Sequence, residues 1–368
     1  MNAPVLSFSK RSIPFPRLRN PSKKINRCPR VPAMNKPLLV FDCHEAWVYQ
    51  LAALDRTMDV VVGLRGRHTT GWDENMRPVP PNARLVRMED VLRNRREYSC
   101  VVAHNLTDLI EAKTIEAPRL LVLHETLDGA LREQGSTVPA DHMREAVAKF
   151  VRLTGTHVVA VSGLKGSSWG FDEDIVPFSA DPAAYLPWRG DLACGLRVAN
   201  HIRRRPHVLL WDFHLQAFDG LPISIVGRNT DMPGVRASSS WNDLKDTLSR
   251  HRFYIHTADP RFEDGYNMAT VEAMAAGLPV LGNLHPTSPV EHGISGFLSD
   301  DPAELRAYAL RLLTDRDLAV RMGQAARATV AVRFSSARFK EAFTRSIESA
   351  EQAWLRRDEP VLCGSFHN

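Results

Sequence analysis

The sequence predicts an α/β protein made of two Rossmann-like domains with parallel sheets. Its 368 residues exceed one domain of ordinary size and allow two, each with its own core. Short apolar stretches alternate with helical patterns along both halves. The segment 254–282 shows this alternation most clearly, as strand, acidic loop, helix and strand. The content of 44% hydrophobic and 24% charged residues is that of a soluble globular protein.

Residues 1–36 differ from the rest in charge. They hold nine basic residues and no acid, whereas the whole chain has a formal net charge of only +5. Because this segment is rich in Pro and Ser and has no apolar period, we expect a disordered basic tail. It could contact anionic lipid or nucleic acid, act as a transit-like peptide, or precede a true start at Met34. We favour plain disorder or the later start.

The first domain is predicted to span residues 37–185. A helix is expected after the first strand and another around 143–151, and the stretch 162–168 is expected to be a Gly/Ser loop that cradles a phosphate or only turns the chain. The expected strands are 38–42, 59–64, 83–88, 100–104, 120–123 and 156–161.

Several side chains of this domain are candidates for binding an anionic or sugar ligand. Arg65, Arg67 and Trp72 lie on a glycine-containing loop, where arginines pair with anions and an aromatic face covers a sugar ring. The alternative is a solvated connecting loop. His124 ends a strand, at the edge of an open α/β sheet where ligands bind. The alternative for His124 is a structural surface histidine.

The cysteines and the apolar runs restrict the class of protein. Cys28, Cys43, Cys100, Cys194 and Cys363 are odd in number and scattered, with no C-x-x-C, so we expect reduced cytosolic thiols. Cys43 and His44 are adjacent and do not by themselves chelate a tetrahedral zinc ion. No apolar run approaches the roughly 20 residues of a membrane span. We therefore expect a cytoplasmic protein.

Residues 186–335 predict the second domain, after a proline-rich hinge at 180–189. Strands are expected at 196–202 and 223–226, and helices at 208–218 and 241–248, with a basic turn at 203–205. The last helix, 336–357, carries an apolar stripe and is expected to be core rather than a cofactor-binding segment. The stripe consists of Phe339, Phe343, Ile347, Ala350 and Trp354.

The acidic loop and helix at 263–276 carry the chemistry. Glu263, Asp264 and Gly265 precede a helix that should end at Gly277, a residue suited to positive φ. Free N–H groups at a helix N-terminus attract anions, whereas carboxylates accept hydrogen bonds from hydroxyls. Glu272 lies about two turns further on. This combination suits a nucleotide sugar, and the alternative is an ordinary amphipathic helix with a capping Asp.

This stretch resembles the donor-binding signature of the retaining GT-B glycosyltransferases of family 4, also called glycosyltransferase group 1. Asp264-Gly265-Tyr266-Asn267 stands for the usual Glu-Gly-Phe-Gly, and the run 272–280 matches Glu-Ala-Met-Ala-x-Gly-x-Pro-Val almost letter for letter. The segment 288–298 resembles the loop and strand that follow. The first carboxylate is one methylene shorter than usual, so either Asp264 or its neighbour Glu263 could contact the sugar.

The resemblance implies a GT-B fold, with a nucleotide sugar on the second domain and an acceptor on the first. It also implies that the last helix, 336–357, packs back on the first domain. The family's diphosphate-binding Arg and Lys correspond here to Asn200 and Arg205. The implied catalytic residues are His124, Asp264 and Glu263. The implied donor-binding residues are Arg205, Asn200, Gly265, Tyr266, Asn267, Glu272 and Gly227. The implied acceptor-binding residues are His44, Arg65, Arg67 and Trp72.

The implied reaction is glycosyl transfer with retention of configuration, without a cofactor or a metal. The acceptor could be a glycan, a lipid-linked molecule or a small molecule; a peripheral contact with the inner face of the membrane is possible, and no nucleic acid is expected. Two alternatives stay open. The chain could be another GT-B enzyme, of epimerase or phosphorylase type, or a catalytically inactive sugar-nucleotide-binding protein.

Overall fold

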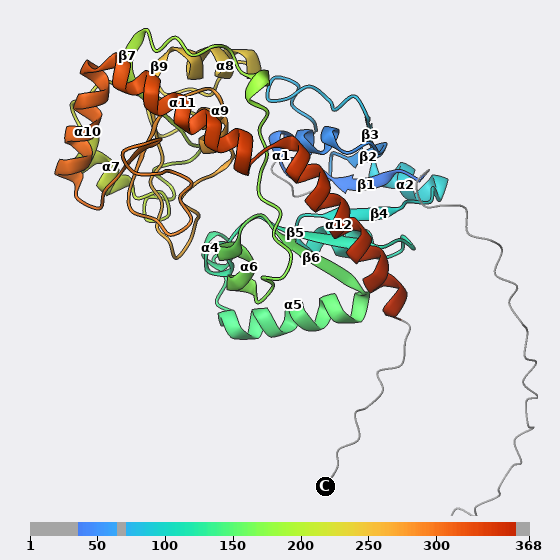
Figure 1. The fold of residues 1–368 in the computed structure, drawn as a ribbon. Coiled ribbons are helices and arrows are strands. Elements are labelled where there is room, and N and C mark those ends of the chain that lie inside the picture. Colours follow the sequence, from blue (N-terminus) through green and yellow to red (C-terminus); the bar gives the residue numbers. More distant parts are fainter. Residues whose placement is uncertain (1–35, 65–70, 358–368) are drawn as a thin grey trace, which may run out of the picture. The chain divides into compact units, whose positions relative to one another are not determined.

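The computed structural model describes residues 36–64 and 71–357 of the chain. Within these ranges the polypeptide forms two parallel β-sheets, each accompanied by helices (Figure 1). The prediction of two Rossmann-like α/β domains is therefore confirmed. The expected basic tail at 1–36, apart from its last residue, and the loop residues Arg65 and Arg67 lie outside the described residues.

The first sheet has six parallel strands in the order β3-β2-β1-β4-β5-β6. Its central strands are buried along their whole length, as strands covered on both faces are. The chain order reverses between β1 and β4, and ligands of open α/β sheets bind beyond the carboxyl ends of the strands at such a point. The strands are β1 Leu38–Phe41, β2 Met58–Val61, β3 Ala83–Val86, β4 Cys100–Ala103, β5 Arg119–Leu123 and β6 Thr156–Ala160.

Most of the helices that connect these strands are short. Three of the helices of this domain, α3, α4 and α6, are capped by a side chain from the residue that precedes them. Asn105 accepts a hydrogen bond from the Asp108 N–H, and Thr126 from the Gly129 N–H. The helices are α1 Glu45–Tyr49, the 3₁₀ turn η2 Gln50–Ala53, α2 Met88–Asn94, α3 Leu106–Glu111, α4 Leu127–Glu133, α5 Ala140–Thr154 and α6 Gly163–Trp169.

Helix α6 corrects the expectation of a loop at 162–168. Ser162 caps its first turn, because its side chain accepts a hydrogen bond from the Lys165 N–H at 3.2 Å, and Gly170, with φ of 81°, ends it. Ser and Gly favour loops, but they also mark the two ends of helices. As a result Lys165 lies in the first turn of a helix.

The second sheet has five parallel strands in the order β11-β10-β9-β7-β8. Its chain order reverses between β7 and β9, so the carboxyl ends of these strands mark the expected ligand edge. The strands are β7 Leu192–Val198, β8 Ile223–Val226, β9 His251–Ile255, β10 Val280–Gly282 and β11 Gly296–Leu298.

The helices of the second domain agree with the sequence patterns except at one boundary. Gly277 follows α9 with φ of 90°, which confirms the predicted left-handed residue at its end. Helix α7 begins later than expected, because the chain turns through 201–210 and Leu210 has φ of 48°. The helices are α7 Trp211–Phe218, α8 Trp241–Arg250, α9 Met268–Ala275, α10 Pro302–Thr314 and α11 Arg316–Arg333.

The last helix, α12 Ser336–Arg356, returns to the first sheet. It packs on β4, β5 and β6 (Figure 1). Phe343, Ile347 and Ala350 are fully buried, so the apolar stripe is core, as its spacing indicates. The chain crosses from the first to the second domain through the 3₁₀ turn η3, Pro182–Ala184.

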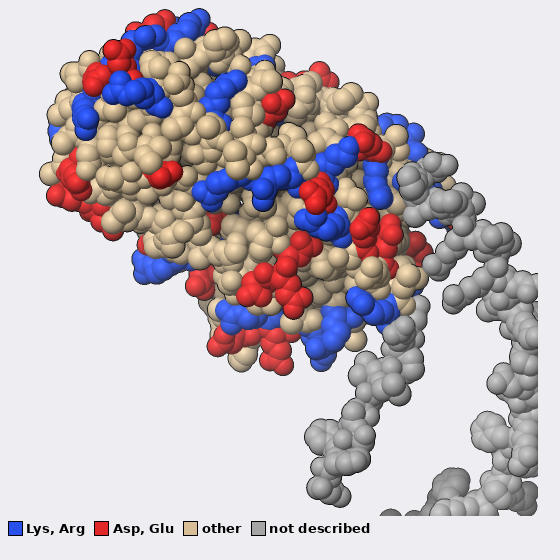
Figure 2. Space-filling view, viewed as in Figure 1, with Lys and Arg blue, Asp and Glu red and all other residues tan. Residues whose placement is uncertain are grey.

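Basic and acidic side chains are interspersed on the face of the molecule shown in Figure 2. Among the described residues, no helix combines the length and the apolar character needed to cross a membrane.

Candidate active site

A buried lysine of the first domain contacts the acidic loop between β9 and α9. The Lys165 Nζ lies 2.7 Å from Glu263 Oε1 and 3.2 Å from Asp264 Oδ2. Burial alone would lower the pKa of Lys165, but the two carboxylates raise it above its ordinary value. Burial would raise the pKa of Glu263, and Lys165 instead holds it below its ordinary value. Lys165 and Glu263 are therefore both ionised at neutral pH.

Two histidines fix the backbone of this loop. The His256 Nε2–H donates to the Asp264 carbonyl at 3.1 Å, and the His285 Nε2–H donates to the Glu263 carbonyl at 3.0 Å. A Cβ on Gly265 would lie only 2.8 Å from the His285 ring. Close packing therefore requires glycine at position 265, because any side chain there would displace the His285 ring that holds the loop.

The N-terminus of α9 is closed by a capping box. Asn267 Oδ1 accepts from the Thr270 N–H at 2.9 Å, and Thr270 Oγ1 accepts from the Asn267 N–H at 3.3 Å. The Gly265 N–H donates to Thr287 Oγ1 at 2.9 Å. Two of the amides predicted to bind a diphosphate, those of Gly265 and Asn267, therefore have partners within the protein. A bound diphosphate would have to compete with these two contacts.

Glu272, on α9, forms an ion pair with Arg77, and both side chains are almost wholly buried. Arg77 comes from the segment between β2 and β3, and its guanidinium lies 4.4 Å from the centre of the Trp241 ring. Trp72 Nε1–H donates to the Arg77 carbonyl at 2.8 Å. Burial and the neighbouring Glu272 raise the pKa of Tyr185 well above its ordinary value. The carboxylate predicted to hold donor hydroxyls is thus already matched with a cation.

His44, a predicted acceptor residue, lies in the same region. Burial lowers the pKa of His44. Arg77 and Arg228 lower it further, and Glu45 and Glu272 raise it, so the imidazole is neutral at neutral pH. The two predicted acceptor residues that the structure describes, His44 and Trp72, are therefore both close to Arg77 and its partner.

The ends of β7 and β8 bring together three predicted donor-binding residues. Asn200 Oδ1 accepts from the Arg228 N–H at 2.8 Å, and Arg205 Nη2 donates to the Asn200 carbonyl at 3.2 Å. Gly227 has φ of 144°, and a Cβ there would lie 2.2 Å from the Ala199 carbonyl oxygen. No other residue fits this turn without moving the backbone, so the glycine sets the spacing of the two strand ends.

Both arginines at this edge have acidic partners in the first domain. Arg205 Nη1 lies 3.1 Å from Glu133 Oε1, and Arg228 Nη2 lies 3.2 Å from Asp73 Oδ2. These pairs are partly exposed, so each contributes little to stability. A phosphate that binds at this edge could displace the carboxylate and pair with either arginine.

Sequence reasoning missed Lys165 and Arg77, the two buried cations opposite the acidic residues. Lys165 lies in a Gly/Ser stretch that resembles a loop, and Arg77 in an irregular segment rich in proline. Neither belongs to a periodic pattern. The one available signal was Ser162 three residues before Lys165, which is the spacing of a helix cap.

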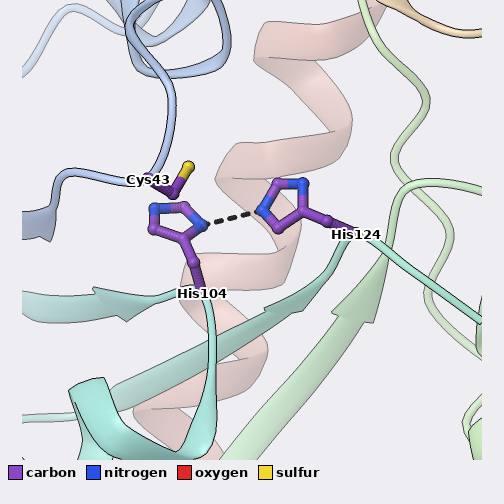
Figure 3. A group of neighbouring side chains, drawn as sticks. All are labelled: Cys43, His104 and His124. Carbon is purple, nitrogen blue, oxygen red and sulfur yellow. Dashed lines mark hydrogen bonds between the residues drawn. The ribbon is translucent and has the colours of Figure 1, made fainter. Parts of the chain in front are cut away.

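Two histidines face each other at the carboxyl edge of the first sheet (Figure 3). His104 follows β4 and His124 follows β5, and His104 Nδ1 lies 2.9 Å from His124 Nε2. Burial, together with His104, Lys165 and His44, holds the pKa of His124 well below its ordinary value. His124 is therefore a neutral imidazole at neutral pH. Cys43, which follows β1, completes a group whose ligand atoms all lie within 4.8 Å of one another.

Comparison with known proteins assigns this architecture to a class. A family model described as Glycosyl transferases group 1 matches residues 222–315, which include the acidic loop and Glu272. Among solved structures, HepE of Anabaena in complex with UDP-glucose has a TM-score of 0.62 and 16% identity, over 85% of this chain and 100% of that chain. The chain has the GT-B fold.

Other solved structures agree with this fold. Sucrose-phosphate synthase from Thermosynechococcus elongatus has a TM-score of 0.60 and 14% identity, over 86% of this chain and 100% of that chain. WaaG, a glycosyltransferase involved in lipopolysaccharide biosynthesis, has a TM-score of 0.56 and 13% identity, over 83% of this chain and 99% of that chain. At these identities the likeness concerns the fold. No curated protein sequence gives a significant match.

Proposed function

We propose that this protein is a glycosyltransferase that moves a sugar from a nucleotide-sugar donor to an acceptor with retention of configuration. The observation that carries the proposal is the group of three acidic residues at α9, Glu263, Asp264 and Glu272, within the residues that match the family model. Carboxylates held in fixed, buried positions suit the hydroxyls of a sugar. We propose a UDP-sugar as the first donor to test, because HepE is solved with UDP-glucose.

In this proposal the donor lies at the carboxyl edge of the second sheet. Its diphosphate would take the amides of Gly265, Tyr266 and Asn267 together with Arg205, while Asn200 and Gly227 border the nucleotide. Once these groups have exchanged their partners within the protein for the donor, they would stabilise the charge that develops on the leaving diphosphate. Binding would cost Arg205 its contact with Glu133.

The acidic residues are proposed to act on the sugar. Lys165 pairs with Glu263 and Asp264, and Arg77 pairs with Glu272, so each of these carboxylates has a cation beside it in the ligand-free protein. Hydroxyls of the sugar would add to these ion pairs as hydrogen-bond donors. His124, neutral at neutral pH, can accept or donate a hydrogen bond to the sugar without adding charge beside the cationic transition state.

The acceptor is proposed to lie on the first domain, against His44, Trp72, Arg65 and Arg67. A glycan, a lipid-linked molecule and a small molecule all fit an aromatic and basic lining. We propose that the protein acts in the cytoplasm, with a possible peripheral contact with the membrane.

The chemistry is proposed to need no metal at the diphosphate. Dication-dependent transferases generally hold the ion with paired carboxylates, and Glu263 and Asp264 are a pair of this kind. Here, however, Lys165 already forms ion pairs with both. Arg205 and the N-terminus of α9 supply positive charge for the diphosphate.

The test begins with thermal shifts of the full chain in UDP-, GDP-, ADP- and dTDP-sugars. A bound donor at one hundred times its Kd stabilises the folded state by about 2.7 kcal/mol, which is readily measured. Transfer is then followed over an acceptor panel in excess EDTA, and the anomeric configuration of the product is read by NMR. We expect one nucleotide class to bind and a retained configuration.

Three outcomes would contradict the proposal. Binding without hydrolysis or transfer over a broad panel would indicate an inactive sugar-nucleotide-binding protein. A phosphate-dependent or acceptor-free conversion would indicate another GT-B enzyme. Loss of activity in EDTA, restored by manganese, would mean that carboxylates of this site coordinate an ion.

A further inference from the structure

Cys43, His104 and His124 form a group that no sequence motif announces. Each follows a different strand of the first sheet, and β1, β4 and β5 are neighbours in that sheet. Their side chains converge at its carboxyl edge, as Figure 3 shows. Thiol sulfur and imidazole nitrogen are the ligands that zinc prefers.

The spacing of the three ligand atoms approaches that of a tetrahedral zinc site. Zn–N and Zn–S bonds of ordinary length separate two nitrogens by about 3.3 Å and a nitrogen from a sulfur by about 3.6 Å. Here the two nitrogens are 2.9 Å apart, and all three ligand atoms lie within 4.8 Å of one another. Small side-chain rotations, without movement of the strands, would therefore close the site around an ion.

The surroundings hold the ligands in this arrangement. The Trp47 ring meets both imidazoles edge-on, with ring centres 4.6 Å from His104 and 5.1 Å from His124. The backbone N–H of His104 donates to Asp108 Oδ2 at 2.8 Å, which fixes the turn that carries His104. Preorganised ligands of this kind lose little freedom when a metal binds.

The local charge also suits a cation. Asp42 precedes Cys43 in the chain, and Asp108 lies beside the His104 backbone. Lys165 acts electrostatically on His124, but its ammonium is paired with Glu263 and Asp264. Negative charge therefore at least balances positive charge around the three ligands, which favours binding of a divalent ion.

We propose that Cys43, His104 and His124 bind one zinc ion with three protein ligands. Three protein ligands leave the fourth tetrahedral position to water or to another small ligand. The thiol proton is released to solvent when the sulfur binds the ion, and the proton shared between His104 Nδ1 and His124 Nε2 moves to the other nitrogen of the ring that carries it. His124 is also a proposed sugar-contacting residue, but metal binding and glycosyl transfer are measured separately, so failure of one proposal is distinguishable from failure of the other.

The test uses the tag-free full chain, freed of metal with a chelator and titrated with Co²⁺. Tetrahedral cobalt with a thiolate ligand gives intense visible d–d bands and a sulfur-to-metal charge-transfer band. We expect both to saturate at one equivalent per chain and to disappear when one equivalent of Zn²⁺ is added. Absence of these bands in the folded wild-type protein would overturn the proposal.

Matched variants assign the site. Cys43→Ser should abolish the charge-transfer band, and His104→Ala should abolish or strongly weaken the tetrahedral d–d bands. Cys194→Ser, which removes a buried free cysteine of the second domain, and His142→Ala, which removes an exposed histidine of α5, should leave the titration unchanged. A charge-transfer band that survives in Cys43→Ser would show that the metal binds at another cysteine and would overturn the assignment.

Discussion

The ligand edges of the two sheets are built in different ways. At the second sheet the edge is set mainly by backbone: the tight turn at Gly227, the close packing of Gly265 on His285 and the capping box of Asn267. At the first sheet it is set by side chains. His104, His124 and Lys165 come from separate segments and meet only after folding.

The family model matches residues 222–315, which lie within the second domain. A backbone turn requires particular residues at fixed short spacing, so it leaves a local motif, and the matched residues 222–315 contain those turns. Side chains that follow β4 and β5, and one in the first turn of α6, come from separate segments and leave no such motif. The carboxyl edge of the first sheet therefore has to be tested residue by residue. Lys165 is the residue through which it contacts the edge of the second sheet.

The largest effect is expected for Lys165. Lys165→Met removes the cation between two buried carboxylates, and breaking such a buried ion pair costs about 3–5 kcal/mol. We expect a marked fall in the melting temperature. The triple variant Lys165→Met with Glu263→Gln and Asp264→Asn should recover much of that loss, because it removes the uncompensated charge.

The matched control is Lys340→Met. Lys340 pairs with Asp55, but both side chains are largely exposed, and exposed pairs contribute at most about 1 kcal/mol. If Lys165→Met melts at the same temperature as Lys340→Met, the buried contact between the two regions does not contribute to stability.

A smaller effect is expected from pH, through His256 of the second edge. Burial lowers the pKa of His256 from 6.5 to about 4, so the unfolded chain binds a proton that the folded chain does not. Stability should therefore fall as pH decreases from 6.5 towards 4, by about 3 kcal/mol at most. His256→Gln keeps a donor for the Asp264 carbonyl and does not titrate.

The measurement is the melting temperature at a series of pH values. The fall between pH 7 and pH 5 should be smaller in His256→Gln than in the wild type. His142→Gln, at an exposed position on α5 of the first region, should follow the wild type. Parallel curves for all three proteins would show that His256 does not govern the acid sensitivity.

Local patterns were sufficient to predict most of the fold. The strand at 223–226, the end of α9 at Gly277 and the buried stripe of α12 all follow from periodicity and from turn residues. The contacts of Glu272 with Arg77 and of Cys43 with His104 could not be predicted in this way. They depend on which strands are neighbours, and a single sequence does not encode strand order in any short segment.

The next effect separates the two adjacent carboxylates. Asp264 is fully buried, whereas the Glu263 side chain keeps 19% of its surface exposed. If Asp264 contacts the sugar, Asp264→Asn should lower kcat on the order of 100-fold while nucleotide affinity changes little. Glu263→Gln loses the same kind of contact with Lys165 and serves as the control. A larger loss of kcat in Glu263→Gln would assign the sugar contact to Glu263.

The smallest effect concerns the place where the first edge competes with the donor. Arg205 contacts Glu133 of α4 at 3.1 Å, and a diphosphate would have to replace that carboxylate. Arg205→Gln should raise the Kd for the nucleotide about tenfold, which corresponds to about 1.4 kcal/mol. Glu133→Gln should lower the Kd slightly, because it frees the guanidinium. Arg204→Gln, at an exposed position in the same turn, should change neither. Calorimetric titration of the four proteins with the nucleotide measures this, and equal effects of Arg205→Gln and Arg204→Gln would mean that the turn is only a solvated basic segment.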